Sequence, residues 1–133
     1  MDFPLDMHKK AMKASEAGLC AGDQGKFWEM SHKMFDNPTN QPTHLDPENL
    51  VKYAEGLGLD MGKFKECLDS GKYVDAIKKR MAEGQSKAGM TGTPAFLFGF
   101  IQPDGTVKAT KKVVGAVPFD KFKDAIDEML KGK

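Results

Sequence analysis

The chain has 133 residues, a length typical of one domain. Its 20 basic and 19 acidic residues are interspersed and give a formal net charge of +1, so it lacks the basic surface of a protein that binds nucleic acid or an anionic membrane. No stretch reaches the roughly 18 apolar residues of a transmembrane helix, and residues 1–5 show neither region of a signal peptide. We therefore expect no nucleic-acid partner and no membrane partner.

Cysteine and histidine residues limit the chemistry further. Cys20 and Cys67 are not in a Cys-x-x-Cys arrangement, which excludes both a redox motif of neighbouring cysteines and a zinc ribbon. His8, His32 and His44 match no zinc spacing either. We therefore expect no metal site and no cofactor, and we interpret His8 and His32 as partly buried residues on helices.

Residues 6–87 carry the signal of helices with one buried face, because apolar residues recur at spacings of three and four. Asp46 followed by Pro47 is a strong helix start, with Asp as the N-cap and Pro at the first helical position. Asp60 is expected to cap the next helix. Residues 36–45 are a polar, proline-containing loop. The predicted helices cover residues 6–20, 24–35, 46–58, 60–70 and 72–87.

Aromatic side chains cluster in the second of these helices. Phe27, Trp28 and Phe35 lie within nine positions of one another. Aromatic side chains on a helix usually lie in the core. The sequence therefore predicts that this cluster is buried.

A β-hairpin follows the helices. Ala95–Phe100 is an apolar run without polar alternation, the pattern of a strand covered on both faces. Pro103-Asp104-Gly105 has the composition of a tight turn and leads to a second strand at Val107–Val114. The last predicted helix, Phe119–Lys131, has one apolar face and is expected to pack on the hairpin.

Several segments together resemble a known family. Met90–Leu97 is similar to the cis-proline loop and following strand of thioredoxin-fold proteins. Phe3-Pro4-Leu5, Cys20–Trp28 and Cys67–Tyr73 are similar to the DsbA-like branch, in which a helical domain is inserted into that fold. The resemblance covers about residues 3–130. It implies an incomplete thioredoxin-like α/β fold in a single DsbA-like domain, with a helical insert at about 6–88 and the hairpin and last helix at about 92–131.

The departure from the family pattern bears on activity. In that family a strand, a catalytic Cys-x-x-Cys and the helix behind it precede the segment that corresponds to Phe3-Pro4-Leu5. Those elements are missing from this sequence, so the chain cannot carry out the family's dithiol chemistry with the family's cysteines. We expect no catalytic residue in it and regard activity as a protein-disulfide oxidoreductase as uncertain for this chain alone.

The resemblance implies two structural features. Only about 5–6% of X-Pro bonds in folded proteins are cis, but the resemblance implies a cis bond between Thr93 and Pro94. The loop formed by Gly92, Thr93 and Pro94 would bind an extended peptide by β-augmentation. Cys20 and Cys67 are either two buried free thiols or, as the family suggests, a structural disulfide. In an oxidising compartment such a bridge would contribute roughly 4 kcal/mol.

Without its catalytic neighbour, the strand at Ala95–Phe100 has an open side that invites pairing. We expect a homodimer in which the strands of two copies pair about a twofold axis through Ala95, Phe96, Leu97 and Phe98. We expect the chain to be a DsbA-like protein without its own redox motif, either a non-catalytic peptide- or protein-interaction module or a truncated paralogue.

Other functions stay open. The chain could be the C-terminal part of a thiol-disulfide oxidoreductase whose Cys-x-x-Cys half lies upstream or on another chain. A lone nucleophile at Cys20 or Cys67 and a purely structural role are further hypotheses. Complete members of the family act outside the cytoplasm, which would place this chain in the periplasm, although the sequence itself leaves the compartment open.

Overall fold

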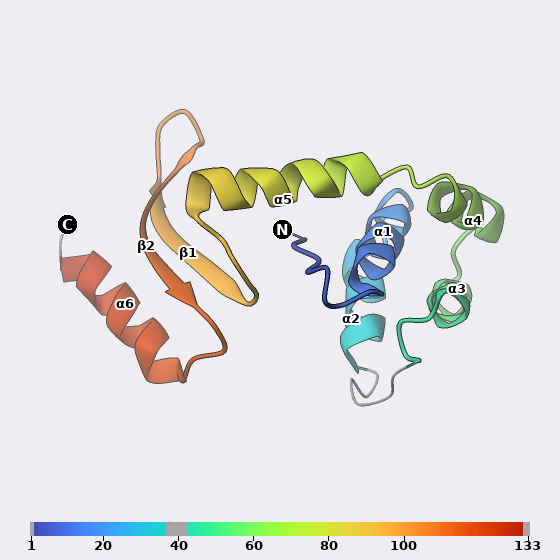
Figure 1. Ribbon diagram of the computed structural model, residues 1–133, viewed down its shortest axis with the longest axis horizontal. Coiled ribbons are helices and arrows are strands. Elements are labelled where there is room, and N and C mark those ends of the chain that lie inside the picture. Colours follow the sequence, from blue (N-terminus) through green and yellow to red (C-terminus); the bar gives the residue numbers. More distant parts are fainter. Residues whose placement is uncertain (1, 37–42, 132–133) are drawn as a thin grey trace. The chain divides into compact units, whose positions relative to one another are not determined.

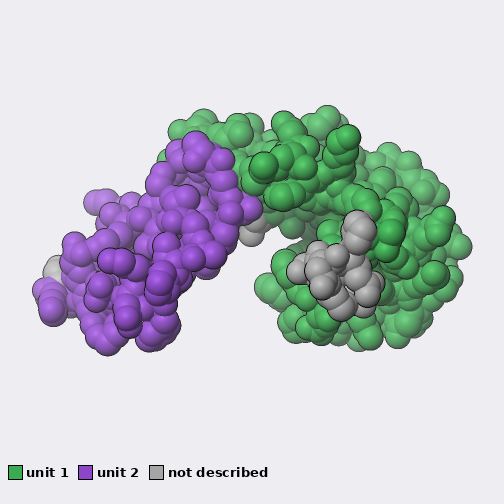
Figure 2. Space-filling view, turned by 60° about the horizontal axis from the view of Figure 1, so that its bottom comes forward, with its two compact units in different colours: residues 1–87 green, residues 88–133 purple. Residues whose placement is uncertain are grey.

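The computed structural model describes residues 2–36 and 43–131 (Figure 1). The chain divides into two compact units, residues 1–87 and residues 88–133, which Figure 2 colours separately. Each unit is described by itself below. The predicted loop at residues 36–45 falls largely on residues 37–42, which lie outside the described part of the chain.

The first unit is helical, as the periodicity predicts. Its helices begin and end within a few residues of the predicted bounds, except that α1 starts later than expected. Residues 6–10 form turns instead, in which the His8 amide donates to the Leu5 carbonyl and the Ala11 amide to the His8 carbonyl, both at 2.8 Å. The helices are α1 (Ala11–Gly22), α2 (Phe27–Asp36), α3 (Pro47–Gly56), α4 (Met61–Asp69) and α5 (Val74–Ala88).

The two predicted helix starts differ in how they are capped. The Asp60 carboxylate accepts a hydrogen bond from the Lys63 amide at 3.1 Å, so it caps α4 as expected. Asp46 occupies the N-cap position of α3 with extended backbone angles, but its side chain accepts no capping hydrogen bond. It pairs instead with Lys10 at 2.5 Å, which ties α3 to the residue before α1.

Helix α1 forms the centre of the first unit and packs against α2, α3 and α4. Its buried face is lined by small side chains, including Ala17 and Ala21, which are both fully buried. Small residues allow neighbouring helices to approach closely. Larger apolar side chains from the surrounding helices complete the core: Met30, Leu50, Phe64 and Leu68.

The second unit contains the predicted hairpin. Strands β1 (Ala95–Ile101) and β2 (Val107–Val114) pair antiparallel in a two-stranded sheet, from Ala95 opposite Val114 to Ile101 opposite Val107. Gly105 has a φ of 80° in the turn, a conformation that glycine adopts without a steric penalty.

One face of the hairpin is covered by α6 (Phe119–Lys131). The Phe122 ring packs edge-on against Phe96 and Phe98, with ring centroids 4.8 and 6.3 Å apart. The expectation that the last helix packs on the hairpin is therefore confirmed, and the mixed helix and strand architecture agrees with a partial thioredoxin-like α/β fold.

Burial differs from the sequence prediction in both units. The prediction that β1 is covered on both faces is wrong for this chain, because Leu97 is 45% exposed and Ile101 is 78% exposed. The aromatic cluster of α2 is not buried as a whole either, since Trp28 is 70% and Phe35 80% exposed and only Phe27 is half-buried. The buried face of α2 is instead centred on Met30.

The histidine prediction also needs correction. His8 and His32, expected to be partly buried, are both exposed. His8 lies in the turns that precede α1, and His32 lies on the outer face of α2. Neither position could be distinguished from a buried one by spacing alone.

Gly99 provides a test of the hairpin geometry. A Cβ atom at this position would lie 2.4 Å from the Lys108 carbonyl oxygen and 2.8 Å from the Ala109 Cα atom, both on β2. Gly99→Ala should therefore destabilise the hairpin by roughly 1–3 kcal/mol, measured as faster hydrogen exchange of the β1 and β2 amides. Gly92→Ala, where a Cβ meets nothing within 4 Å, should leave exchange nearly unchanged. Equal effects of the two substitutions would contradict this geometry.

Candidate functional site

A disulfide joins Cys20 on α1 to Cys67 on α4, with an S–S distance of 2.06 Å and a Cα–Cα distance of 5.9 Å. Cys20 is 1% exposed and Cys67 is 8% exposed. Of the two states left open by the sequence, the structure therefore has the bridge and not two free thiols. A lone cysteine nucleophile is not present in this oxidised form.

An ionised cluster lies beside this disulfide. The carboxylate of Asp23, just after α1, accepts hydrogen bonds from the Lys72 ammonium at 2.7 Å and from the Tyr73 hydroxyl. The hydrogen bonds from Lys72 and then Tyr73 hold the pKa of Asp23 below its usual value of 3.8. The same carboxylate raises the pKa values of Lys72 and Tyr73 above their usual values. Asp23 Oδ2 also lies 3.8 Å from Cys67 Sγ.

Other polar contacts hold the same pair of segments together. The Lys13 ammonium on α1 donates to the Leu68 carbonyl on α4 at 2.8 Å. The Gln24 side chain donates to the Asp60 carbonyl at 3.2 Å and accepts from the Asp60 amide at 2.8 Å. The disulfide is therefore one of several links between α1 and α4, which favours a structural role for it.

The proline loop lies in the second unit. The Thr93–Pro94 peptide bond is cis, and both residues are exposed, while Gly92 is half-buried. The Pro94 carbonyl accepts a hydrogen bond from the Gly115 amide at 2.8 Å. The loop is thus anchored to the end of β2 on one side, and its two exposed residues are accessible to another chain.

Strand β1 continues from this loop and pairs with β2 only, among the residues that the structure describes. Backbone groups of successive residues in a strand point to opposite sides. Because the Pro94 carbonyl points to β2, the backbone groups of Ala95 and Leu97 point to the open side. Of the residues predicted for the dimer contact, Ala95 and Leu97 therefore direct their backbone groups to the open edge, whereas Phe96 and Phe98 direct theirs to Val113 and Lys111 of β2.

The predicted site residues fall in separate units: the cysteines in the first, and the proline loop and the edge in the second. Within residues 2–36 and 43–131, no group of three or more His, Cys, Asp or Glu side chains could hold a metal ion. In the same part of the chain, no helix is long and apolar enough to span a membrane.

Sequence reasoning missed the Asp23 cluster, because its partners lie 49 and 50 residues away along the chain. The available signal was indirect. Lys72 and Tyr73 follow soon after Cys67, so pairing the two cysteines brings both residues close to Asp23.

Comparison with known proteins identifies the family to which the chain belongs. Residues 1–127 match the model of the DSBA-like thioredoxin domain. The chain belongs to this family. The similarity of the Met90–Leu97 and Phe3-Pro4-Leu5 segments to DsbA-like proteins is therefore confirmed by a match over nearly the full length.

Curated relatives of this DsbA-like chain are longer proteins. The Na(+)/H(+) antiporter NhaA 1 of Salinispora arenicola is 37% identical over 95 residues, which are 71% of this chain and 14% of the antiporter. NhaA of Herminiimonas arsenicoxydans is 36% identical over 92 residues, again 14% of its length. The protein YwbO of Bacillus subtilis is 27% identical over 135 residues, which cover all of this chain and 62% of YwbO. No solved structure shows significant similarity to the chain.

The disulfide yields a stability prediction. It closes a loop of 47 residues, so its reduction should lower the free energy of unfolding of the first unit by roughly 4 kcal/mol in the chain-entropy model. Urea unfolding, followed through Trp28 fluorescence with and without a phosphine reductant, measures the difference. The double variant Cys20→Ala/Cys67→Ala should resemble the reduced protein and not respond to the reductant. Equal stability of oxidised and reduced protein would contradict the prediction.

The Asp23 cluster yields a pH prediction. Because the folded pKa of Asp23 is lowered from 3.8, its stabilising contribution is present above the unfolded value and is lost as the pH falls through the folded value. The stability difference between the wild type and Asp23→Asn should therefore be constant at neutral pH and shrink in acid, measured by urea unfolding at a series of pH values. Tyr73→Phe, which removes only one of the two hydrogen bonds, should show a smaller pH-dependent difference. A difference that does not change with pH would contradict this.

Proposed function

We propose that this domain is a non-catalytic interaction module of the DsbA-like family that binds another polypeptide strand along the open edge of β1. The observation that carries the proposal is the apolar strand Ala95–Ile101, which has a hydrogen-bonded neighbour on one side only within the described residues. Unpaired N–H and C=O groups on an apolar edge readily accept a further strand.

The occupant that we propose is β1 of a second copy. Antiparallel pairing of two identical edges about a twofold axis gives a four-stranded sheet, and such an isologous contact closes on itself. The exposed side chains next to the edge support a protein contact, since Leu97 is 45% and Ile101 78% exposed. Large apolar groups exposed together are typical of interaction surfaces.

The proline loop would extend this contact. Thr93 and Pro94 are exposed and lie directly before β1, so a strand that pairs with β1 would continue along the Thr93 backbone. An extended peptide could bind in the same place as the second copy. Both would compete for the same edge, which gives the module one binding surface.

Leu97 provides the test. Its amide points to the open side, so Leu97→Pro should remove one edge hydrogen bond from each copy while it leaves the pairing with β2 intact. Two such bonds contribute about 2 kcal/mol, or roughly 30-fold in the dimer Kd. Size-exclusion chromatography with light scattering measures the shift to monomer. Leu97→Val retains the amide and should remain dimeric, whereas a monomeric wild type at micromolar concentration would exclude the dimer.

A second candidate function is favoured by the length of one relative. YwbO matches the whole chain with only 62% of its own length, so this chain could be one part of a protein-disulfide oxidoreductase whose Cys-x-x-Cys part is supplied upstream or by another chain. The upstream DNA separates the two candidates. An in-frame strand and a Cys-x-x-Cys would favour the oxidoreductase, and an insulin-reduction assay on the extended protein would then show activity that the present chain lacks.

A further inference from the structure

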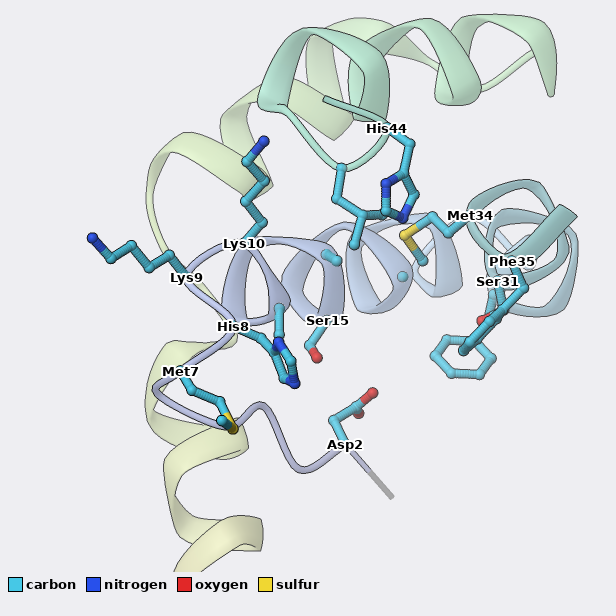
Figure 3. Close-up of a pocket in the computed structure, with 15 residues that line it drawn as sticks. Asp2, Met7, His8, Lys9, Lys10, Ser15, Ser31, Met34, Phe35 and His44 are labelled. Carbon is cyan, nitrogen blue, oxygen red and sulfur yellow. The ribbon is translucent and has the colours of Figure 1, made fainter. Parts of the chain in front are cut away.

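Two hollows of the first unit lie along α1 and differ in their chemistry. The larger is an apolar groove of about 740 Å³, formed by α1, α2, the turns before α1 and the residues before α3. Asp2, His8 and Ser15 direct polar groups into this groove (Figure 3), and the Asp2 carboxylate faces Arg80 at 3.7 Å. Neither cysteine lines it.

The second hollow lies where the disulfide joins α1 to α4 and has a volume of about 460 Å³. Both cysteines belong to its wall, but Cys20 is 1% exposed and Cys67 is 8% exposed. A reagent that enters from solvent therefore reaches Cys67 more readily than Cys20. The charged side chains of this wall are Asp23, Lys63, Glu66 and Lys72.

One of these charges lies directly beside the more accessible sulfur. Asp23 Oδ2 is 3.8 Å from Cys67 Sγ, and the hydrogen bonds from Lys72 and then Tyr73 lower the pKa of this carboxyl, so it is ionised at neutral pH. The Lys72 ammonium lies 2.7 Å from the same oxygen, whereas Lys63 pairs with Asp60 at 3.6 Å. An incoming anion therefore meets a carboxylate beside the sulfur, and Lys72 offsets part of the repulsion.

We propose that Cys67 Sγ is the atom at which a small thiol opens this disulfide, and that Asp23 selects against anionic thiols there. The thiolate forms a bond to Cys67 Sγ, the Cys20–Cys67 bond breaks, and its electron pair leaves with Cys20 Sγ, which takes a proton from solvent. A second thiolate then attacks the sulfur that the first one supplied. This step yields the oxidised, dimeric form of the thiol and releases Cys67 as a thiolate, so the thiol is oxidised and the bridge is reduced.

The selection acts on the rate of this exchange. The attacking species is the thiolate, so its charge is felt as it approaches Cys67 Sγ. A unit charge about 4 Å away changes the rate of an ionic reaction roughly fivefold in water, and added salt screens the effect. Cys20 belongs to the apolar core, where burial disfavours a departing thiolate. The bridge therefore opens slowly with any thiol, and most slowly with an anionic one.

Thiols of different charge give the first test. As thiolates, cysteamine has no net charge and mercaptopropionate is doubly anionic. Reduction in excess thiol at neutral pH is followed by acid quenching, alkylation and mass spectrometry, and the rate constant of each variant is divided by that of the wild type for the same thiol. This ratio removes the differences in nucleophilicity between thiols. Asp23→Asn should give a ratio of roughly five with mercaptopropionate and at most about two with cysteamine.

The two members of the ion pair give the second test. Lys72→Met leaves the Asp23 carboxylate unopposed, so it should slow reduction by mercaptopropionate, whereas Asp23→Asn should accelerate it. If the pair acted only by holding the fold together, both substitutions would loosen it and both would accelerate reduction. Acceleration in both variants would therefore overturn the proposal, as would a ratio for Asp23→Asn that is the same with every thiol.

Matched variants control for structure and for charge elsewhere. Tyr73→Phe removes a hydrogen bond to Asp23 without a change of charge, so its ratio should not depend on the thiol. Asp69→Asn makes the same charge change at an exposed position of α4 that lines a different hollow, and it should reduce as the wild type does. Leu97→Pro, in the other unit, should also match the wild type whether or not the dimer forms.

Urea and salt complete the experiment. Reduction of the folded protein should change little with urea below the unfolding transition, and high salt should bring the Asp23→Asn ratio towards one. A wild-type rate that rises with urea as steeply as global unfolding does would show that the thiol attacks the unfolded chain. That result would overturn the assignment to Cys67 Sγ in the fold.

Discussion

The close packing of α1 on three other helices is the constraint on which the first unit depends. Ala17 and Ala21 are fully buried on this helix, and a larger side chain at either position would separate α1 from its neighbours at a cost of roughly 1–3 kcal/mol. The disulfide to α4 and the hydrogen bonds of Lys13 and Gln24 then fix the position of α1 relative to α4. The Asp23 cluster lies at the end of α1, and the apolar groove around Ser15 lies along α1, so the geometry of both depends on this packing.

The sequence predicted the order and type of the elements because these depend on local patterns. Spacings of three and four identify helices, and Pro103-Asp104-Gly105 between two apolar runs identifies a hairpin. Burial was harder to predict, because it depends on which face of an element meets a neighbour. Phe35 on α2 and Leu97 on β1 are as apolar as core residues, yet 80% and 45% of their surfaces are exposed.

The candidate site could be predicted only where the resemblance to a known family indicated which residues, far apart in the sequence, lie together in the fold. The pairing of Cys20 with Cys67 and the cis bond before Pro94 were expected from the family, since neither follows from spacing. The Asp23 cluster and the groove at Ser15 were not predicted. Both bring together side chains from distant segments, and the residues involved are ordinary surface types with no distinctive local pattern.

The two units differ in what holds each of them folded. Both cysteines lie in the first unit, where the buried apolar residues also concentrate, whereas Met90 and Ala125 are the buried apolar residues of the second within its described part. A crosslink restricts the unfolded ensemble only of the segment that it closes, so the hairpin and α6 gain nothing from it. We therefore expect that the two units do not unfold together in one cooperative transition. In the proposed dimer, a strand added by a second copy would stabilise the unit that lacks a covalent link, and association would then be part of the folding of residues 88–133.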